Sequence, residues 1–318
     1  MAEIAKIRIG NEEQPYDIKD ANARDDVLEL YRANNVTTSR KDLAYTFADE
    51  VAEYEGNAWA WLKARLNSNN FSDICIGDIM RVDTTYEISP GNTFYFGARV
   101  VGINTYRGFN RTVKNHIDFC SARCFPVPHR YNMIDTNNGN ALQGVNWLAS
   151  DLYLWLNSLS GSISSDFEGG TQAVDYTSDG VYYYLPENLK NAITPKEAVL
   201  SYRYSESGYL SDDSNFGTGY MGKLWLPTEN EVFGIPVMGG KTQNTLKNAI
   251  QYPWFTSVYN RAKYVGNSGG KTASWWLSTA STNSDKKKWC NVSWSGEPTH
   301  ADATTAYSVP VCFRIMAD

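Results

Sequence analysis

The chain has 318 residues, and 29 Lys and Arg against 35 Asp and Glu leave a formal net charge of −6 at pH 7. This balance argues against a nucleic-acid-binding surface spread over the whole chain, because phosphate binding needs clustered positive charge. Hydrophobic residues make up 42%. No apolar run approaches the roughly 20 residues of a membrane span, so we expect no membrane insertion. The first residues contain no apolar signal-peptide region either.

The chain is rich in aromatic residues and poor in histidine. It has 21 Tyr, 10 Trp and 12 Phe beside 24 Gly, but only three His. Large amphipathic side chains in such numbers suit a contact surface, and catalysis built on histidine is disfavoured. The composition therefore predicts a loop-rich, β-containing protein that binds rather than catalyses.

The first segment, residues 1–36, predicts a small attachment element. Two short strands are expected within residues 4–18 around a polar turn, followed by a helix over residues 21–32. This segment is too small to bury a core alone. We therefore expect a partner to cover its hydrophobic side.

A helical stalk is expected over residues 37–70, with a helix from about 39 to 67 that begins at Thr and Ser caps. Its apolar residues recur in steps of three and four, close to a heptad, which indicates self-association as a homotrimer. An amphipathic helix packed on its own domain is the alternative, and Gly56 in the middle favours it.

Residues 71–318 predict one α+β domain of short strands and a few helices. Paired strands are expected on either side of the turn Ser89-Pro90-Gly91-Asn92. Ser150 is expected to cap one helix, and Thr228 with Glu231 has the spacing of a capping box for another. Strand-like runs fill the tail from residue 274 to 315.

The five cysteines include no C-x-x-C pair, which argues against a zinc ribbon or a disulfide scaffold. Cys120 and Cys124 lie beside phenylalanines and are expected to be buried thiols. Cys290 and Cys312 lie in apolar strand-like runs that are compatible with a disulfide. Without an export signal we expect them reduced, and apolar surroundings are expected to make them inert.

No metal or cofactor site stands out. The three histidines are far apart, and His116, in a strand-like run, is expected to be structural, whereas His129 is expected in a loop. Oxygen-rich runs at 135–140 and 212–215 lack EF-hand spacing, so Asx-rich turns explain them better than calcium. The lysines at 286–288 predict a solvated loop.

Several motifs resemble known proteins. In chain order they are FSDICIGD, VVGINTY, NHIDFC, DTNNGNALQGVNWLASDLYLWLN, LWLPTENEVFG, SWWLSTAS and YSVPVCFRI. Their order is similar to an uncharacterised domain family of gut Firmicutes and their phages, whose usual ending is a WWLRSP-type strand and a G-V-R-P-type final strand. Here SWWLSTAS lacks the Arg and Pro, and Val309-Pro310-Val311 replaces the second pattern, which weakens inference about a shared ligand. KIRIGNEEQPYDIKDANAR is similar to the opening of phage tail, baseplate and fibre proteins.

The resemblance implies a C-type-lectin-like fold for residues 71–318, shared with formylglycine-generating enzymes and the variable proteins of diversity-generating retroelements. It implies a virion protein that is assembled in the host cytoplasm and binds a host surface glycan or protein, or decorates the particle. The N-terminal segment would contact other virion proteins. An oxidase using Cys290 and Cys312, and a prophage-encoded variable adhesin, are the alternatives.

In the lectin-like variable proteins the ligand surface lies between the WW strand and the final strand, which maps to residues 279–307 here. Alternation predicts Trp289, Asn291 and Ser293 outward and Cys290 and Val292 inward. Closure of the core by Trp289 and Trp294 is the alternative. The expected ligand-binding residues are Lys287, Trp289, Asn291, Ser293, Trp294, Glu297, His300, Asp302 and Tyr307.

Overall fold

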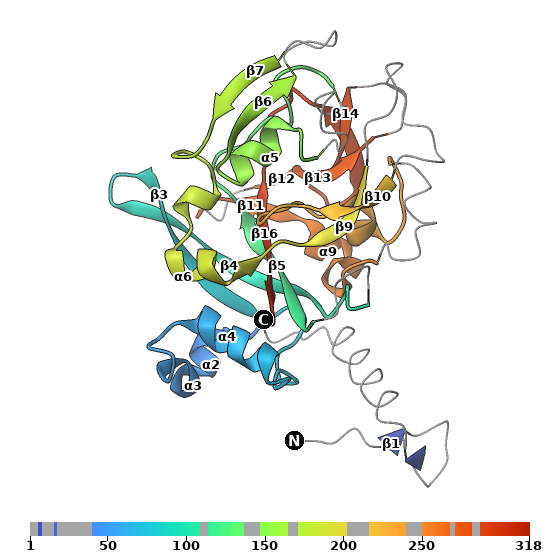
Figure 1. Cartoon of the computed structure of the whole chain (residues 1–318). Helices are drawn as coiled ribbons and strands as arrows, with labels where there is room; N and C mark the ends of the chain where they lie inside the picture. Colours follow the sequence, from blue (N-terminus) through green and yellow to red (C-terminus); the bar gives the residue numbers. More distant parts are fainter. Residues whose placement is uncertain are drawn as a thin grey trace.

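The computed structural model describes residues 40–108, 114–136, 147–164, 171–201, 216–239, 250–267, 271–281 and 287–318, together with two strand fragments at 6–7 and 16–17. The chain mixes helices and strands, and the strands dominate (Figure 1). The fold class expected from the sequence is confirmed at the level of a mixed helical and β structure.

The largest sheet has seven strands and is organised around β5. One edge of β5 pairs with β4 (antiparallel) and, further along, with β11 (parallel), while β16 pairs along the other edge. The predicted turn at residues 89–92 joins β3 to β4, where Gly91 has a φ of 76° that favours glycine. The strands are β3 (Ile79–Ser89), β4 (Asn92–Ile103), β5 (His116–Cys124), β8 (Ile193–Thr194), β11 (Lys263–Val265), β12 (Thr272–Ala273) and β16 (Pro310–Met316).

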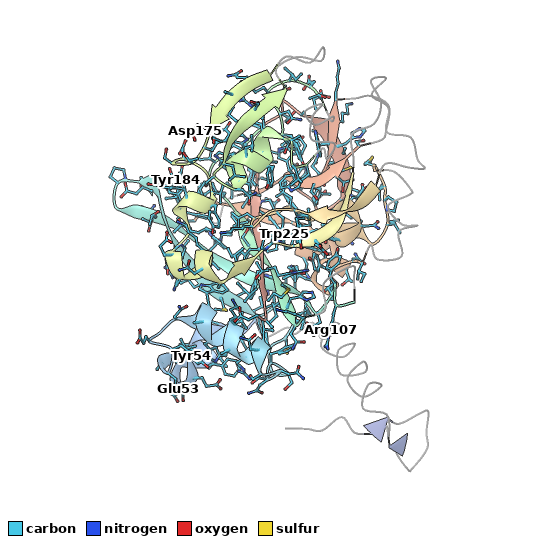
Figure 2. All side chains as sticks on the ribbon, viewed as in Figure 1. Glu53, Tyr54, Arg107, Asp175, Tyr184 and Trp225 are labelled. Atoms are coloured by element: carbon cyan, nitrogen blue, oxygen red, sulfur yellow. The ribbon has the colours of Figure 1, made fainter. Side chains whose placement is uncertain are left out.

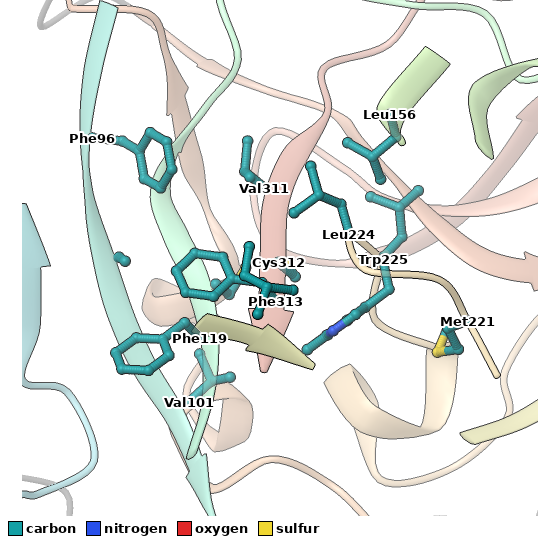
Figure 3. Packing of buried hydrophobic residues seen from close by; sticks show 14 of the residues in the cluster. Phe96, Val101, Phe119, Leu156, Met221, Leu224, Trp225, Val311, Cys312 and Phe313 are labelled. Atoms are coloured by element: carbon teal, nitrogen blue, oxygen red, sulfur yellow. The ribbon is translucent and has the colours of Figure 1, made fainter. Parts of the chain in front are cut away.

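The hydrophobic core surrounds β16. In Figure 3 this strand runs between Phe119 on one side and Trp225 on the other. Phe313 stacks on Phe119 with ring centroids 5.3 Å apart, and the backbone of Cys312 accepts a hydrogen bond from Trp225 N at 3.0 Å. All four side chains are fully buried. The last strand is therefore covered on both faces, which explains its nearly continuous apolar run.

Four smaller sheets complete the strand content. The three-stranded sheet places β14 between two antiparallel neighbours, and the other three sheets are two-stranded antiparallel pairs. The strands are β13 (Trp275–Ala280), β14 (Lys288–Val292) and β15 (Pro298–Asp302), then β6 (Ser160–Ser164) with β7 (Thr171–Asp175), β9 (Glu197–Ser201) with β10 (Phe216–Tyr220), and β1 (Lys6–Ile7) with β2 (Tyr16–Asp17).

Short helices connect these sheets, and two predicted helix caps are confirmed. The Ser150 side chain accepts a hydrogen bond from Tyr153 N at the start of α5. Thr228 and Glu231 form the expected capping box of α7. The helices are α5 (Asp151–Leu156), α6 (Glu187–Ala192), α7 (Glu229–Phe233) and α9 (Val258–Arg261), with 3₁₀ turns η1 (Tyr182–Tyr184) and η2 (Pro253–Thr256).

The single helix expected over residues 39–67 is wrong. The chain forms three helices instead, because it leaves the helical region at two places. Phe47 has φ −112° and ψ 33° between the first two helices, and Glu55 and Gly56 adopt φ angles of 57° and 76° before the third. Glu53 and Tyr54, just before this break, lie at the margin of the molecule (Figure 2). The three helices are α2 (Leu43–Thr46), α3 (Ala48–Ala52) and α4 (Ala58–Asn67).

The apolar positions of these helices belong to the core of the same chain. Leu43 and Leu66 are fully buried in the cluster that contains the main sheet. Trp59 makes edge-to-face contacts with Phe119 and Phe313, each with ring centroids 5.5 Å apart. The near-heptad spacing therefore reflects packing on the sheet, which was the alternative interpretation, and these residues are not available for a coiled-coil seam.

The N-terminal segment is described only at its strand pair. Lys6 faces Asp17 and Ile7 faces Tyr16 in an antiparallel register, in agreement with the two short strands expected there. The helix expected over residues 21–32 lies outside the described residues.

Candidate functional site

The predicted binding residues lie on the hairpin of β14 and β15, and the structure separates them. Lys288 pairs with Asp302 at one end, and Val292 pairs with Pro298 at the other. Lys287 and Asp302 therefore lie at the opposite end from Trp294. Lys287, Trp294 and Glu297 are exposed, whereas Ser293, His300, Asp302 and Tyr307 are partly buried.

Two predicted binding residues are buried, so the expectation that Trp289 and Asn291 face outward is wrong. Both side chains are 0% exposed. Trp289 Nε1 donates to Thr136 O at 3.0 Å, and its ring stacks on Tyr131 with centroids 3.6 Å apart. Asn291 lies opposite Trp276 on the neighbouring strand. Because β14 is the central strand of its sheet and is covered on both faces, all its side chains from 289 to 292 are buried.

Trp294 is different from every other tryptophan of the chain. Its side chain is 65% exposed, whereas the other nine tryptophans are at most 5% exposed. Trp294 is the second residue after the end of β14, in the turn to β15. An exposed indole at such a position is available for contact with a ligand.

The turn that carries Trp294 has a defined shape. Ser293 N donates to Glu297 O at 2.8 Å, and Glu297 N donates to Ser293 Oγ at 3.0 Å. Gly296 has a φ of 90°, and a Cβ added there would lie 2.4 Å from Val258 O of α9. The turn is therefore pressed against α9, and glycine is required at residue 296.

Trp294 borders a hollow of about 400 Å³ that it shares with Tyr264, Lys271 and Thr272. Tyr264 is itself 44% exposed. An aromatic face beside hydroxyl and ammonium groups is the combination that holds a sugar ring, through stacking and hydrogen bonds to its hydroxyls.

A second hollow, of about 380 Å³, adjoins the first through Tyr264, which lines both. It lies between η2, α9, β5 and β11. Its described lining includes Arg40, Arg99, Arg123 and Lys263. None of these four residues was predicted from the sequence, because they come from four distant parts of the chain and share no motif.

The cysteines are all buried and free, as expected for a reduced protein. Burial and the neighbouring Glu229 carboxyl raise the pKa of the Cys290 thiol, so this thiol is inert. Cys312 lies opposite Cys120 rather than beside Cys290. Burial raises the pKa of Cys120, but a hydrogen bond from Cys312 and the ammonium of Lys263 outweigh it and bring this pKa to about 7. Cys120 is buried, as expected.

The histidines are separated in the structure. His116 is fully buried, and its ring nitrogens lie 3.1 Å from Tyr106 N and 3.0 Å from Lys114 O, which confirms a structural role. His300 Nδ1 lies 2.9 Å from Ser281 Oγ.

Within the described residues, no three His, Cys, Asp or Glu side chains form a group that could hold a metal ion. Asp135 Oδ1 accepts a hydrogen bond from Thr304 N at 3.1 Å, and the oxygen-rich runs at 137–140 and 212–215 lie outside the described residues. In the same described part of the chain, no helix has the length and hydropathy of a membrane span.

Comparison with known proteins places the chain in a family. No curated protein and no solved structure is significantly similar to it. The family model described as "Domain of unknown function (DUF6273)" matches residues 129–317, more than half of the chain, including the Trp294 turn and the final strand. The chain belongs to the DUF6273 family.

Proposed function

We propose that this chain is a non-catalytic binding protein that holds a glycan on the surface around Trp294. The observation that carries the proposal is the contrast between one tryptophan that is 65% exposed and nine that are at most 5% exposed. The other nine indoles are buried. Trp294 is therefore the indole that the fold leaves available to a ligand.

The surroundings of Trp294 favour a sugar over a flat apolar partner. Tyr264 adds a second aromatic face, and Lys271 and Thr272 add hydrogen-bonding groups. Aromatic faces stack on the C–H groups of a sugar ring, while nearby polar groups fix its orientation. The turn held by Gly296 against α9 keeps the indole in place before binding, which reduces the entropy lost on association.

The resemblance of the N-terminal segment to phage tail and fibre proteins supports a place in a virion. In that setting the segment at residues 1–36 contacts other virion proteins, and the Trp294 surface contacts a host-cell glycan. Several copies on one particle would raise the avidity of a weak site. The near-heptad spacing no longer supports a homotrimer, because the apolar residues of α2–α4 are buried in the core.

The test is a glycan array followed by calorimetric titration of the best ligand. Trp294→Ala is expected to weaken binding by about 30-fold, the effect of removing a central aromatic contact residue. Because the side chain is exposed, the free energy of unfolding should change by less than about 0.5 kcal/mol. The loss of binding would then reflect the contact and not the fold.

Tyr220→Ala is the matched control. Tyr220 is 54% exposed and borders another hollow, of about 540 Å³, together with Tyr182 and Lys223. Its replacement should leave binding unchanged. Loss of binding in Tyr220→Ala but not in Trp294→Ala would move the site to that hollow and overturn the proposal.

A further inference from the structure

The hollow next to the Trp294 surface gathers positive charge, with no carboxylate in its described lining. Arg40, Arg99, Arg123 and Lys263 line it, and none of its described lining residues is acidic. The whole chain carries a net charge of −6. A hollow lined by four cations and no carboxylate therefore differs in charge from the chain as a whole.

The buried cations of the described residues divide into two groups. Two of the five, Arg99 and Lys263, are 8% and 3% exposed and pair with no carboxylate of those residues. Both line this hollow. The other three are each paired, Arg65 with Asp73, Lys196 with Glu231 and Arg314 with Asp118.

Neutral groups hold these cations in place. Arg99 Nη1 donates to Gly77 O at 3.1 Å, and its guanidinium lies 4.3 Å from the ring centroid of Trp254. Lys263 Nζ donates to Ser121 O at 2.6 Å, and Arg123 Nη1 donates to Asn267 O at 2.6 Å. These contacts fix positions, and none of them is made to a carboxylate. The acidic group beside Lys263 is the Cys120 thiol, whose pKa is lowered to about 7 by Cys312 and by this ammonium. Cations held in this way are prepared for an anion.

Burial and the neighbouring cation both destabilise the charged form of Arg99. Burial, and then the nearby guanidinium of Arg40, lower the pKa of Arg99 to about 10. An oxyanion in the hollow would reverse both effects, because it would replace lost hydration and offset the like charge.

We infer that this hollow binds the oxyanion of an acidic glycan whose neighbouring ring stacks on Trp294. Tyr264 lines both hollows, so one extended ligand can occupy them together. The inference rests on the proposed function and specifies its ligand class, a saccharide that carries carboxylate or phosphate groups. Arginine suits either group, because its planar donors match two oxygens at once.

The test compares three probes by calorimetric titration: a galacturonate oligomer, a glycerol-phosphate oligomer that carries sugar substituents, and a neutral glucan of the same length. At least one acidic probe is expected to bind about tenfold more tightly than the neutral one, and this advantage should shrink as salt is added. The acidic probe that binds better identifies carboxylate or phosphate as the source of the charge.

Arg40→Gln and Arg123→Gln are the informative variants. Each should weaken the acidic probe by about tenfold and leave the neutral probe unchanged. Arg40 is exposed, and its only described contact is with the Trp254 ring at 5.6 Å, so its replacement does not threaten the fold. Lys287→Gln removes one exposed positive charge at the far end of the β14–β15 hairpin and is the control.

The outcomes separate this inference from the proposed function. Equal affinity for acidic and neutral probes, or equal effects of Arg40→Gln and Lys287→Gln, would overturn the anion site and leave the Trp294 surface standing. Arginine variants that weaken the acidic probe while Trp294→Ala weakens none would overturn the glycan surface and retain the anion site.

Discussion

Two groups of charged side chains lie along β5, and they are built in opposite ways. Asp118 belongs to an interior cluster of charged side chains. Ala122 lies four residues further along the strand, about 13 Å away, and borders the basic hollow. In the interior cluster each buried cation has a buried anion. In the hollow Arg99 and Lys263 pair with no carboxylate of the described residues, and the ionisable group beside Lys263 is the Cys120 thiol.

The interior cluster is complete in its hydrogen bonds. Arg314 donates to both oxygens of Asp118 at 2.7 and 2.8 Å, and the Tyr252 hydroxyl donates to Asp118 at 2.8 Å. Lys196 and the Tyr106 hydroxyl donate to Glu231, the residue that also caps α7. This cluster therefore uses its charges to fix the fold.

The contrast teaches how to assign roles to buried charges. A buried ion that is paired and hydrogen-bonded holds elements together, and a buried cation without an anion is stable only because neutral dipoles and aromatic rings support it. The first arrangement resists change, whereas the second leaves room for a charged ligand. Replacing a buried arginine by methionine in each group tests this difference.

The largest effect is expected for Arg314→Met. The change leaves the fully buried Asp118 carboxylate without its cation, which should lower the free energy of unfolding by about 3–5 kcal/mol. Urea denaturation followed by tryptophan fluorescence measures it, since nine of the ten tryptophans are buried. A loss no greater than that of Arg81→Gln, in the exposed Arg81–Asp83 pair, would contradict a structural role for the interior cluster.

The parts of the fold that local chemistry dictates could be predicted. The turn at Gly91 and the capping box of Thr228 and Glu231 depend on residues close in sequence, and both are confirmed. The prediction of one long helix was wrong because the backbone leaves the helical region at Phe47 and again at Glu55 and Gly56, which gives three shorter helices. Hydrophobic periodicity indicates that residues are buried, but it does not indicate which part of the molecule or which partner covers them.

The second prediction concerns acid stability. Burial, and then the charge of Arg314, lower the pKa of His116 to about 3, so the folded protein holds this ring neutral. An unfolded chain takes up its proton near pH 6.5, and between these values it binds one more proton than the folded chain. The contribution of His116 to the free energy of unfolding should therefore fall by about 1.4 kcal/mol for each pH unit below 6.5.

His116→Gln should remove about one proton from this dependence when urea denaturation is repeated from pH 6.5 to 4.5. Burial also lowers the pKa of His129, which contributes in the same direction and leaves a residual slope. Asp118 does not contribute in this window, because its pKa is lowered to about 2 and its stabilising effect is lost only below about pH 4. An unchanged slope in the variant would mean that His116 is protonated in the folded protein.

The candidate site was predicted only in part, because the alternation of residues along β14 does not determine which of them are exposed. Alternation assigned Trp289 to the surface, but a central strand covered on both faces buries every residue, whatever the pattern. Trp294 was selected correctly as exposed because it lies beyond the strand end. Tyr264, which borders the same hollow as Trp294, and Arg99 of the adjoining hollow could not be found from sequence, since only the pairing of β5 with β4 and β11 brings their strands together.

The smallest effect is expected for Arg99→Met, the counterpart of Arg314→Met. Both remove a buried guanidinium, but Arg99 leaves behind only the carbonyl of Gly77 and not a carboxylate. The methionine side chain still packs on Trp254, and the repulsion from Arg40 disappears. The free energy of unfolding should therefore fall by about 1 kcal/mol or less. A loss as large as that of Arg314→Met would show that Arg99 also holds the fold together. The two groups of charges would then differ in geometry but would both stabilise the fold.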